Sequence, residues 1–186
     1  MLAHRTRRIV SLLAALAVLS GCDSNPSPAP LPSESPSPSS SSPSPTATPP
    51  TLPAAAKGTS EASAKAFVRY WVETLNYAGD TGDTSGLRRV SSPECKSCVG
   101  IANKIDRVYK QGGYVRGDGW VVRSMAPVSG QPRGRPILQI GMFLSEQDLL
   151  ERAGGEVQHF DGGKQPMVFR LTNNDRWVVT EIEQNA

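Results

Sequence analysis

Hydrophobic positions follow three different patterns along the chain. Residues 1–21 contain one short apolar run, residues 22–58 hold almost no large apolar side chain, and residues 59–186 mix apolar and polar positions densely. Only the last pattern predicts a core large enough for a folded domain of modest size. We therefore expect a leader at 1–21, a disordered linker at 22–58 and one domain at 59–186.

The domain begins with a pattern of helical spacing. A capping hydroxyl at Thr59 or Ser60 precedes it, and Gly79 is expected to end the helix. The residues at this spacing are Phe67, Tyr70, Trp71, Thr74, Leu75 and Ala78. Such an aromatic group indicates a core-packing face.

Two further helices are predicted. Residues 84–90 fit a short helix, and residues 92–94 (Ser-Pro-Glu) read as a helix start with a capping hydroxyl and proline at the first helical position. The third helix is expected to stop at Gly112. Its apolar face holds Cys98, Ile101, Ile105 and Val108.

After Gly113 the pattern becomes that of strands rich in Val, Ile, Phe and Trp. The predicted strands cover residues 114–125, 137–145, 157–160, 167–171 and 177–182, the last two joined as a hairpin by a Thr-Asn-Asn-Asp turn. Residues 146–152 fit either a helical turn or a continuing strand, and both interpretations stay open.

Helices followed by a run of antiparallel strands predict the α+β class. The first helix with Phe67, Tyr70 and Trp71, and the closing hairpin, resemble the nuclear-transport-factor-two-like family, also described as SnoaL-like. In the hairpin the resemblance is carried by Phe169, Leu171, Trp177, Val179 and Ile182. It implies a cone fold, in which N-terminal helices pack into the concave face of a curved antiparallel sheet.

The leader has the features of an export signal. Three arginines precede an apolar run at residues 9–19, which is shorter than the roughly 20 residues that a membrane-spanning helix needs. The run ends in Leu-Ser-Gly-Cys, closing at Cys22, which resembles the lipobox of bacterial lipoproteins. The resemblance implies cleavage before Cys22, a diacylglycerol on its thiol and anchoring at the extracytoplasmic face of the cell membrane. A plain signal with a chance cysteine, or an uncleaved anchor, is the alternative.

The linker has the composition of an extended spacer. Between residues 24 and 53, eleven of thirty residues are Pro and ten are Ser, and Glu34 is the only charged residue. Such a segment cannot bury enough apolar surface to fold, and as polyproline II it reaches at most roughly 90 Å. The lipobox, the linker and the domain together resemble an actinobacterial lipoprotein family of uncharacterised function.

Charge changes the picture once the leader is removed. The full chain has a formal net charge of +3, but residues 1–21 hold three arginines and no acid, so the processed chain is formally neutral. Bulk charge therefore gives no reason to expect a nucleic-acid partner. An asymmetry remains, with seven basic residues in 104–135 and five acids against Arg152 in 146–161. It fits a solvated face, with a docking surface as the alternative.

Two cysteines remain after Cys22 is assigned to the lipid. Cys95 and Cys98 are expected to form a disulfide, as is usual in an exported protein. A thioredoxin-type motif follows a strand, whereas a helix precedes this pair. One such pair with His159 cannot supply four zinc ligands. No metal and no cofactor are expected, and redox activity is kept as an alternative.

No catalytic residue is predicted. His159 lies beside a Gly-rich turn and is expected at the surface, although a base in the cone is the alternative. Asp106 and Glu73 fit exposed helix faces. The candidate contact residues are Tyr70, Trp71 and Trp120, expected to shape a cavity, and Arg116, Arg123, Arg133 and Arg135, expected to rim it.

The sequence therefore favours a membrane-anchored, non-catalytic binding or accessory lipoprotein. Its partners are the membrane, through Cys22, and an unidentified cell-envelope protein or ligand. The alternatives are a small pocket enzyme of isomerase or dehydratase type and an exported thiol-disulfide protein. A pocket enzyme needs at least two polar groups converging in an apolar cavity, and a redox protein needs an exposed cysteine.

Overall fold

The computed structural model describes residues 47–184. The predicted leader, the predicted lipidation site Cys22 and most of the predicted linker lie outside the described residues. Within residues 47–184, no helix is both long and apolar enough to cross a membrane.

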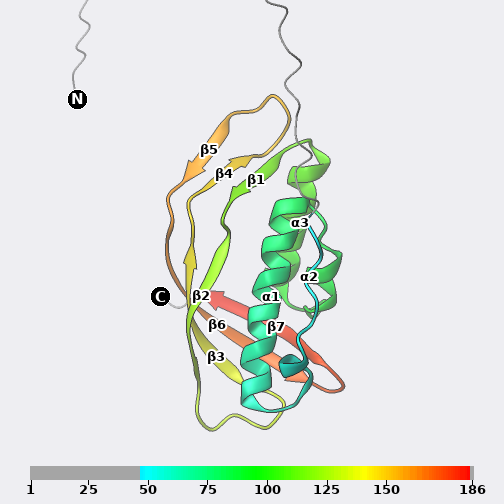
Figure 1. Cartoon of the computed structure of the whole chain (residues 1–186), viewed down its shortest axis with the longest axis vertical. Helices are drawn as coiled ribbons and strands as arrows, with labels where there is room; N and C mark the ends of the chain where they lie inside the picture. The colour runs from blue at the N-terminus through cyan, green and yellow to red at the C-terminus, as the bar shows by residue number, and fades with distance from the viewer. Residues whose placement is uncertain (1–46, 185–186) are drawn as a thin grey trace, which may run out of the picture. The chain divides into compact units, whose positions relative to one another are not determined.

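Helical elements come first in the described chain and lie together on one side of the sheet (Figure 1). They are the 3-10 helix η1 (Ala54–Lys57) and the α-helices α1 (Glu61–Thr81), α2 (Ser85–Arg89) and α3 (Lys96–Lys110). The three predicted helices are thus confirmed, with changes at their ends.

The first helix starts where the sequence predicts and ends later. The Ser60 hydroxyl accepts a hydrogen bond from the Ser63 N–H at 3.1 Å, which caps α1. The predicted end at Gly79 is wrong, because α1 continues to Thr81 and closes at Gly82 with a left-handed φ of 78°. A Cβ on Gly82 would lie 2.5 Å from the Tyr109 ring, so glycine is needed there for space as well as for conformation.

The third helix begins later than the Ser-Pro-Glu signal predicts. Cys95 is the residue before α3, whereas Ser92 forms a tight turn ahead of it. The Ser92 hydroxyl accepts from the Glu94 N–H at 3.2 Å, and the Ser92 carbonyl accepts from the Cys95 N–H at 3.1 Å. Ser92 therefore stabilises a tight turn that leads into α3 and does not cap the helix itself.

All strands pair antiparallel. They are β1 (Tyr114–Gly117), β2 (Trp120–Pro127), β3 (Ile137–Leu144), β4 (Gln147–Leu150), β5 (Val157–Phe160), β6 (Gly163–Asn173) and β7 (Trp177–Gln184). Their orders are β1-β4-β5 in one sheet and β2-β3-β6-β7 in the other. The predicted α+β class, with helices on a curved antiparallel sheet, is confirmed. Residues 146–152, for which the sequence fits either a helical turn or a strand, contain the strand β4.

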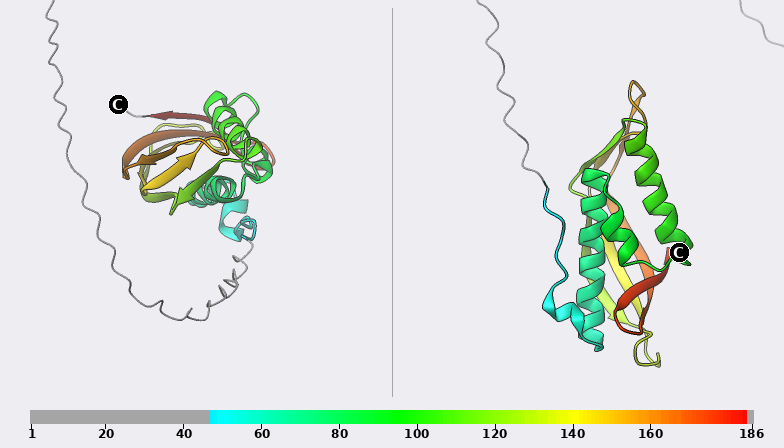
Figure 2. Two further views of the ribbon diagram at one scale, coloured as in Figure 1. Left: turned by 90° about the horizontal axis from the view of Figure 1, so that it is seen from above. Right: turned by 90° about the vertical axis from the view of Figure 1, so that its right-hand side faces the viewer.

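The two sheets are joined end to end, because the chain runs directly from a strand of one sheet into a strand of the other. The chain passes from β1 to β2, from β3 to β4 and from β5 to β6 at a common bend, and Figure 2 shows the strands curling around one side of the helices. The predicted single strand 114–125 is broken there, because Gly117 and Gly119 have positive φ. A Cβ on Gly117 would lie 2.3 Å from the Glu146 carbonyl oxygen. Small residues thus let neighbouring strands approach at the bend.

The core lies between the helices and the concave side of the sheet. Trp71 of α1 is 1% exposed and meets the Phe169 ring of β6 edge-on, with ring centroids 5.3 Å apart. Its indole N–H donates to the Ser91 hydroxyl at 2.9 Å, which satisfies the one polar atom it buries. The ring contact between Trp71 and Phe169 holds α1 against β6.

The end of the predicted linker belongs to the packed domain. Ala56 in η1 is 2% exposed, and the Trp177 indole N–H donates to the Gly58 carbonyl at 2.7 Å. The described part of the segment 22–58 is therefore ordered against the domain, and the domain starts earlier than the change in composition. Leu52 and Ala56 pack against the hydrophobic core there.

Candidate binding cavity between the helices and the bent sheet

A cavity of about 200 Å³ lies where α1 and α3 face the bend of the sheet. We call it the α1–α3 cavity. Its apolar walls are formed by Leu75, Ile101, Ile105, Val108, Val115, Trp120 and Leu149. The helical spacing places Leu75 on α1 and the next three residues on the inner face of α3, and the strands supply the rest. An apolar lining of this kind is typical of binding sites for small apolar groups.

The one amide from α1 in the cavity wall is already engaged. The Asn76 Nδ2 donates to the Trp120 carbonyl at 2.9 Å, and the Trp120 N–H donates to the Asn76 Oδ1 at 2.8 Å. This side chain therefore serves as a strand-like partner for the first residue of β2. The sequence analysis missed it, although an asparagine in a helix interior is a signal, because its side chain competes with the helix backbone.

The charged groups in the wall are Asp80 and Lys104. Partial burial raises the pKa of the Asp80 carboxyl. Within the described residues, Asp80 and Lys104 form no ion pair or side-chain hydrogen bond. The Tyr109 hydroxyl, which donates to the Gly79 carbonyl, lies nearby, and burial, with a smaller effect of the Asp80 charge, raises its pKa.

The predicted aromatic contact residues are divided among different places. Trp120 is half-buried and lines the α1–α3 cavity, as expected. Trp71 is a core residue against Phe169. Tyr70 lines a separate cavity of about 370 Å³ beside Trp177 and the ordered end of the linker. Only Trp120 therefore remains a candidate for this site.

The predicted arginines do not line the α1–α3 cavity. Arg116 stacks over the Tyr114 ring at 4.0 Å and Arg123 over the Phe143 ring at 5.6 Å. Arg133 lies in the loop before β3, in a hollow of about 530 Å³ beside the start of α1, and Arg135 is exposed in the same loop. The expectation that these four residues rim one cavity is wrong, because Arg116 and Arg123 stack on aromatic rings of the strands while Arg133 and Arg135 lie in the loop before β3.

The cysteine pair forms the expected disulfide. Cys95 and Cys98 are bonded with a Cα–Cα distance of 5.3 Å, and each is 1% exposed. The Cys98 N–H also donates to the Cys95 Sγ at 3.2 Å. A buried bond at the start of α3 is a structural link, and it offers no exposed thiol for redox chemistry.

His159 is at the surface, as predicted. Its Nδ1 lies 2.8 Å from the Asp148 carboxylate across the β4–β5 pair, and its Nε2 lies 3.8 Å from Asp161. The hydrogen bond that the imidazole donates to Asp148 raises the pKa of His159, and the charges of Asp148, Asp161 and Glu146 add to this shift. His159 does not line the α1–α3 cavity.

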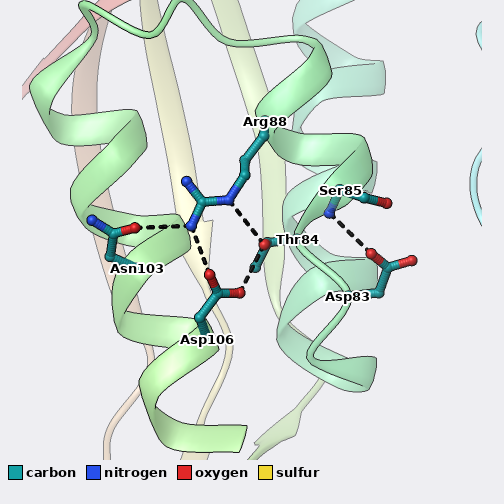
Figure 3. A network of polar contacts seen from close by, with 6 residues as sticks. All are labelled: Asp83, Thr84, Ser85, Arg88, Asn103 and Asp106. Atoms are coloured by element: carbon teal, nitrogen blue, oxygen red, sulfur yellow. Dashed lines mark hydrogen bonds and ion pairs between the residues drawn. The ribbon is translucent and has the colours of Figure 1, made fainter. Parts of the chain in front are cut away.

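A polar network joins α2 to α3 (Figure 3). The Thr84 hydroxyl donates to Asp106 at 2.8 Å, and the Arg88 guanidinium donates to Asp106 at 2.7 Å and to Asn103 at 2.8 Å. Burial opposes ionisation, but the hydrogen bonds from Thr84 and Arg88 outweigh it and lower the pKa of Asp106. Asp106, expected on an exposed face, is half-buried with its side chain 28% exposed, whereas Glu73 is exposed as expected. The network holds two helices together.

The described residues contain no cluster of three or more histidine, cysteine or acidic side chains suited to a metal ion. The α1–α3 cavity thus offers apolar walls, the engaged amide of Asn76, the amide of Gln147 and two unpaired charges. This arrangement suits binding of a small apolar group better than it suits proton transfer.

Comparison with known proteins gives a family match. The model of a family of unknown function (DUF6318) matches residues 37–135. No curated protein matches the chain. The match includes α1, α2, α3 and the first two strands, which supply all of the cavity wall except Gln147 and Leu149.

Two solved structures are similar in outline. One is the intermembrane space region of the chloroplast protein ARC6, with a TM-score of 0.49 and 12% identity over 69% of this chain and 98% of that chain. The other is a nuclear transport factor 2 (NTF2-like) superfamily protein from Salmonella enterica serovar Typhimurium, with a TM-score of 0.39 and 15% identity over 66% of this chain and 92% of that chain. These scores are too low to carry an argument about function, and the fold class rests on the element order and sheet register given above.

Proposed function

The chain belongs to a family of unknown function (DUF6318), and we propose that this member is a lipid-anchored, extracytoplasmic binding module. The anchor is supported by the Leu-Ser-Gly-Cys end of the leader at Cys22 and by the Pro/Ser-rich segment after it. The Cys95–Cys98 disulfide supports an oxidising compartment. The alternative of a small pocket enzyme of isomerase or dehydratase type lacks a comparable observation.

The α1–α3 cavity is the observation that carries the binding role. A pocket enzyme needs polar groups that converge on a substrate and are free to act on it. Here both ends of the Asn76 amide are held by the Trp120 backbone, His159 lies elsewhere, and Asp80 and Lys104 are the two charged groups in an otherwise mainly apolar wall. What the cavity offers a ligand is mainly apolar surface.

The volume of the cavity limits the size of the ligand that it can hold. Its volume of about 200 Å³ is below the range of drug-sized pockets, which is roughly 300–1,000 Å³. Apolar cavities of about 150 Å³ bind benzene. We therefore expect the α1–α3 cavity to hold one ring-sized apolar group, such as a side chain presented by a partner, and not a large metabolite.

The test is a titration with benzene and with free indole. Binding is measured from the NMR shifts of the backbone amides and of the tryptophan side-chain N–H groups. The sample is the chain from residue 22 onward with Cys22→Ala, which keeps the whole processed sequence without lipid. We expect saturable shifts at Trp120 and Ile105. Val115→Trp fills the cavity and should abolish them, whereas Val157→Trp, on an exposed strand of the same sheet, should not.

The outcome that contradicts the proposal is equally defined. If neither probe gives saturable shifts at cavity residues, or if both tryptophan variants respond like the unsubstituted chain, the cavity is not a binding site. Circular dichroism of each variant shows whether the fold is kept.

A further inference from the structure

Two sheet edges of the domain, at β7 and at the start of β2, are partly covered by other parts of the chain. On β7, Ser92 donates its N–H to the Val179 carbonyl at 2.7 Å, and Val179 donates its N–H to the Val90 carbonyl at 3.0 Å. At the start of β2, the Asn76 amide does the same for Trp120. Covered edges of this kind prevent unwanted strand pairing.

The edge at β5 is different. β5 pairs only with β4, and Figure 1 shows it at the outer margin of the upper strands. In the described residues, the backbone of Val157–Phe160 makes no further hydrogen bond to another segment. All four residues are exposed, and Val157 (47%) and Phe160 (40%) are the exposed large hydrophobic residues of residues 47–184. This edge is an open template for another strand.

The two faces of β5 differ in chemistry. Partners across a strand pair share a face, and Phe160 is paired with Gln147, which lines the α1–α3 cavity. His159 is paired with Asp148 and therefore faces the other side of the sheet, where Asp161 also approaches it. One face is thus apolar at Phe160, and the other carries carboxylates.

The surroundings of β5 are acidic. Residues 146–161 hold Glu146, Asp148, Glu151, Glu156 and Asp161 against the single cation Arg152. A second copy of the chain would bring two such acidic edges together, which like charges disfavour at neutral pH. The chain's own segment 22–46 contains no lysine or arginine, and its prolines lack the N–H donors of a strand. Neither is a suitable occupant.

We propose that β5 is the docking edge for an extended, basic segment of a partner protein, which adds to the sheet as a further strand. Backbone hydrogen bonds to Val157–Phe160 give the contact its direction, and the acidic side chains select lysine or arginine. Apolar residues of the segment alternate with basic ones, so that they meet Phe160 while the basic residues face Asp148 and Asp161. This inference stands on the strand edge and not on the cavity.

The experiment uses a synthetic peptide of alternating lysine and valine, the same peptide with glutamate in place of lysine, and the residue 22–186 chain with Cys22→Ala. We expect the lysine peptide to shift the amide signals of β5 and to bind less tightly as salt is added. The glutamate peptide should not bind. Two further lysine peptides carry backbone N-methyl groups, the first along one edge of the peptide strand and the second along the other edge. The peptide whose methylated edge faces β5 should lose binding.

Matched variants separate the edge from general charge attraction. Val157→Lys with Phe160→Lys should weaken the lysine peptide by about tenfold, or ~1.4 kcal/mol. Glu156→Lys should also weaken it, whereas Glu73→Lys, the same charge change on α1, should leave binding within about twofold.

Three results would overturn the proposal. Equal binding of the glutamate peptide would remove the charge argument, and retention of binding by both N-methylated peptides would remove strand addition. Concentration-dependent self-association through β5 without peptide would assign the edge to a second copy instead. Loss of benzene binding in the cavity affects none of these readouts, so the two proposals fail separately.

Discussion

The side chain of Asn76 and the backbone of Trp120 form a closed pair of hydrogen bonds, with N···O distances of 2.9 and 2.8 Å. The pair ties the middle of α1 to the first residue of β2, next to the bend of the sheet. A Cβ on Gly119 would lie 2.6 Å from the Asn76 Oδ1, so the preceding glycine leaves room for it. One wall of the α1–α3 cavity is therefore set by this contact.

Replacing this amide should destabilise the domain. Asn76→Leu leaves the partly buried N–H and carbonyl of Trp120 without partners, which is expected to cost about 1–3 kcal/mol of unfolding free energy. Urea unfolding measures this cost. Asn174→Leu in the exposed β6–β7 turn is the control and should change it by less than about 0.5 kcal/mol. Similar values for both variants would show that the pair carries no stability.

Glycine at the bend should be required for space and not only for conformation. Gly117 (φ 151°) and Gly130 (φ 77°) both have positive φ, so alanine is strained at either position. Only at Gly117 does a Cβ meet the Glu146 carbonyl at 2.3 Å, while nothing lies within 4 Å at Gly130. Gly117→Ala should therefore lower the melting temperature clearly more than Gly130→Ala, and equal losses would contradict this account of the bend.

The sequence predicted the elements better than the site. Periodicity and caps are local signals, so the helices and most strands could be found, including the capping hydroxyl of Ser60. The break at Gly117–Gly119, the Asn76–Trp120 pair and the Asp106 network depend on residues 18 to 44 positions apart, which no local pattern brings together. Trp120 lines the α1–α3 cavity, whereas the arginines predicted around it lie elsewhere.

His159 should titrate above its ordinary pKa of about 6.5. Its raised pKa comes first from the hydrogen bond of Asp148, so the protonated form is favoured in the folded state. The pair therefore stabilises the fold at pH values below the ordinary pKa, and this contribution is lost as pH rises through the folded-state pKa. NMR titration of the imidazole measures the pKa directly. Asp148→Asn should lower it, whereas Glu73→Gln should not, and a pKa unchanged by Asp148→Asn would contradict the assignment.

The disulfide should contribute modestly to stability. Cys95 and Cys98 enclose a very short loop, for which the chain-entropy relation gives about 2 kcal/mol or less. Reduction should loosen the start of α3 while the domain stays folded, as measured by hydrogen exchange of the α3 amides and by circular dichroism. Global unfolding on reduction would contradict this prediction. So would two thiols that are freely alkylated in protein taken from its native compartment.

Removing His159 or the cysteine pair should leave binding in the α1–α3 cavity intact. The cavity account places contact at Trp120, so Trp120→Ala should reduce the benzene and indole shifts far more than His159→Ala does. The same titration of each variant, with circular dichroism as the folding control, makes the comparison. If His159→Ala alone abolished a function of the folded protein, the pocket-enzyme alternative would take over.

The central claim, that Cys22 anchors an extracytoplasmic binding module, is tested most directly by mass spectrometry of the N-terminal peptide. The protein is isolated from the membrane fraction of cells making the native chain and, in parallel, the Cys22→Ala variant. We predict that the native chain begins at Cys22 and carries the added mass of a diacylglycerol, and that the variant keeps its leader or leaves the membrane. A native chain that begins elsewhere, or that carries an unmodified Cys22, would contradict the account.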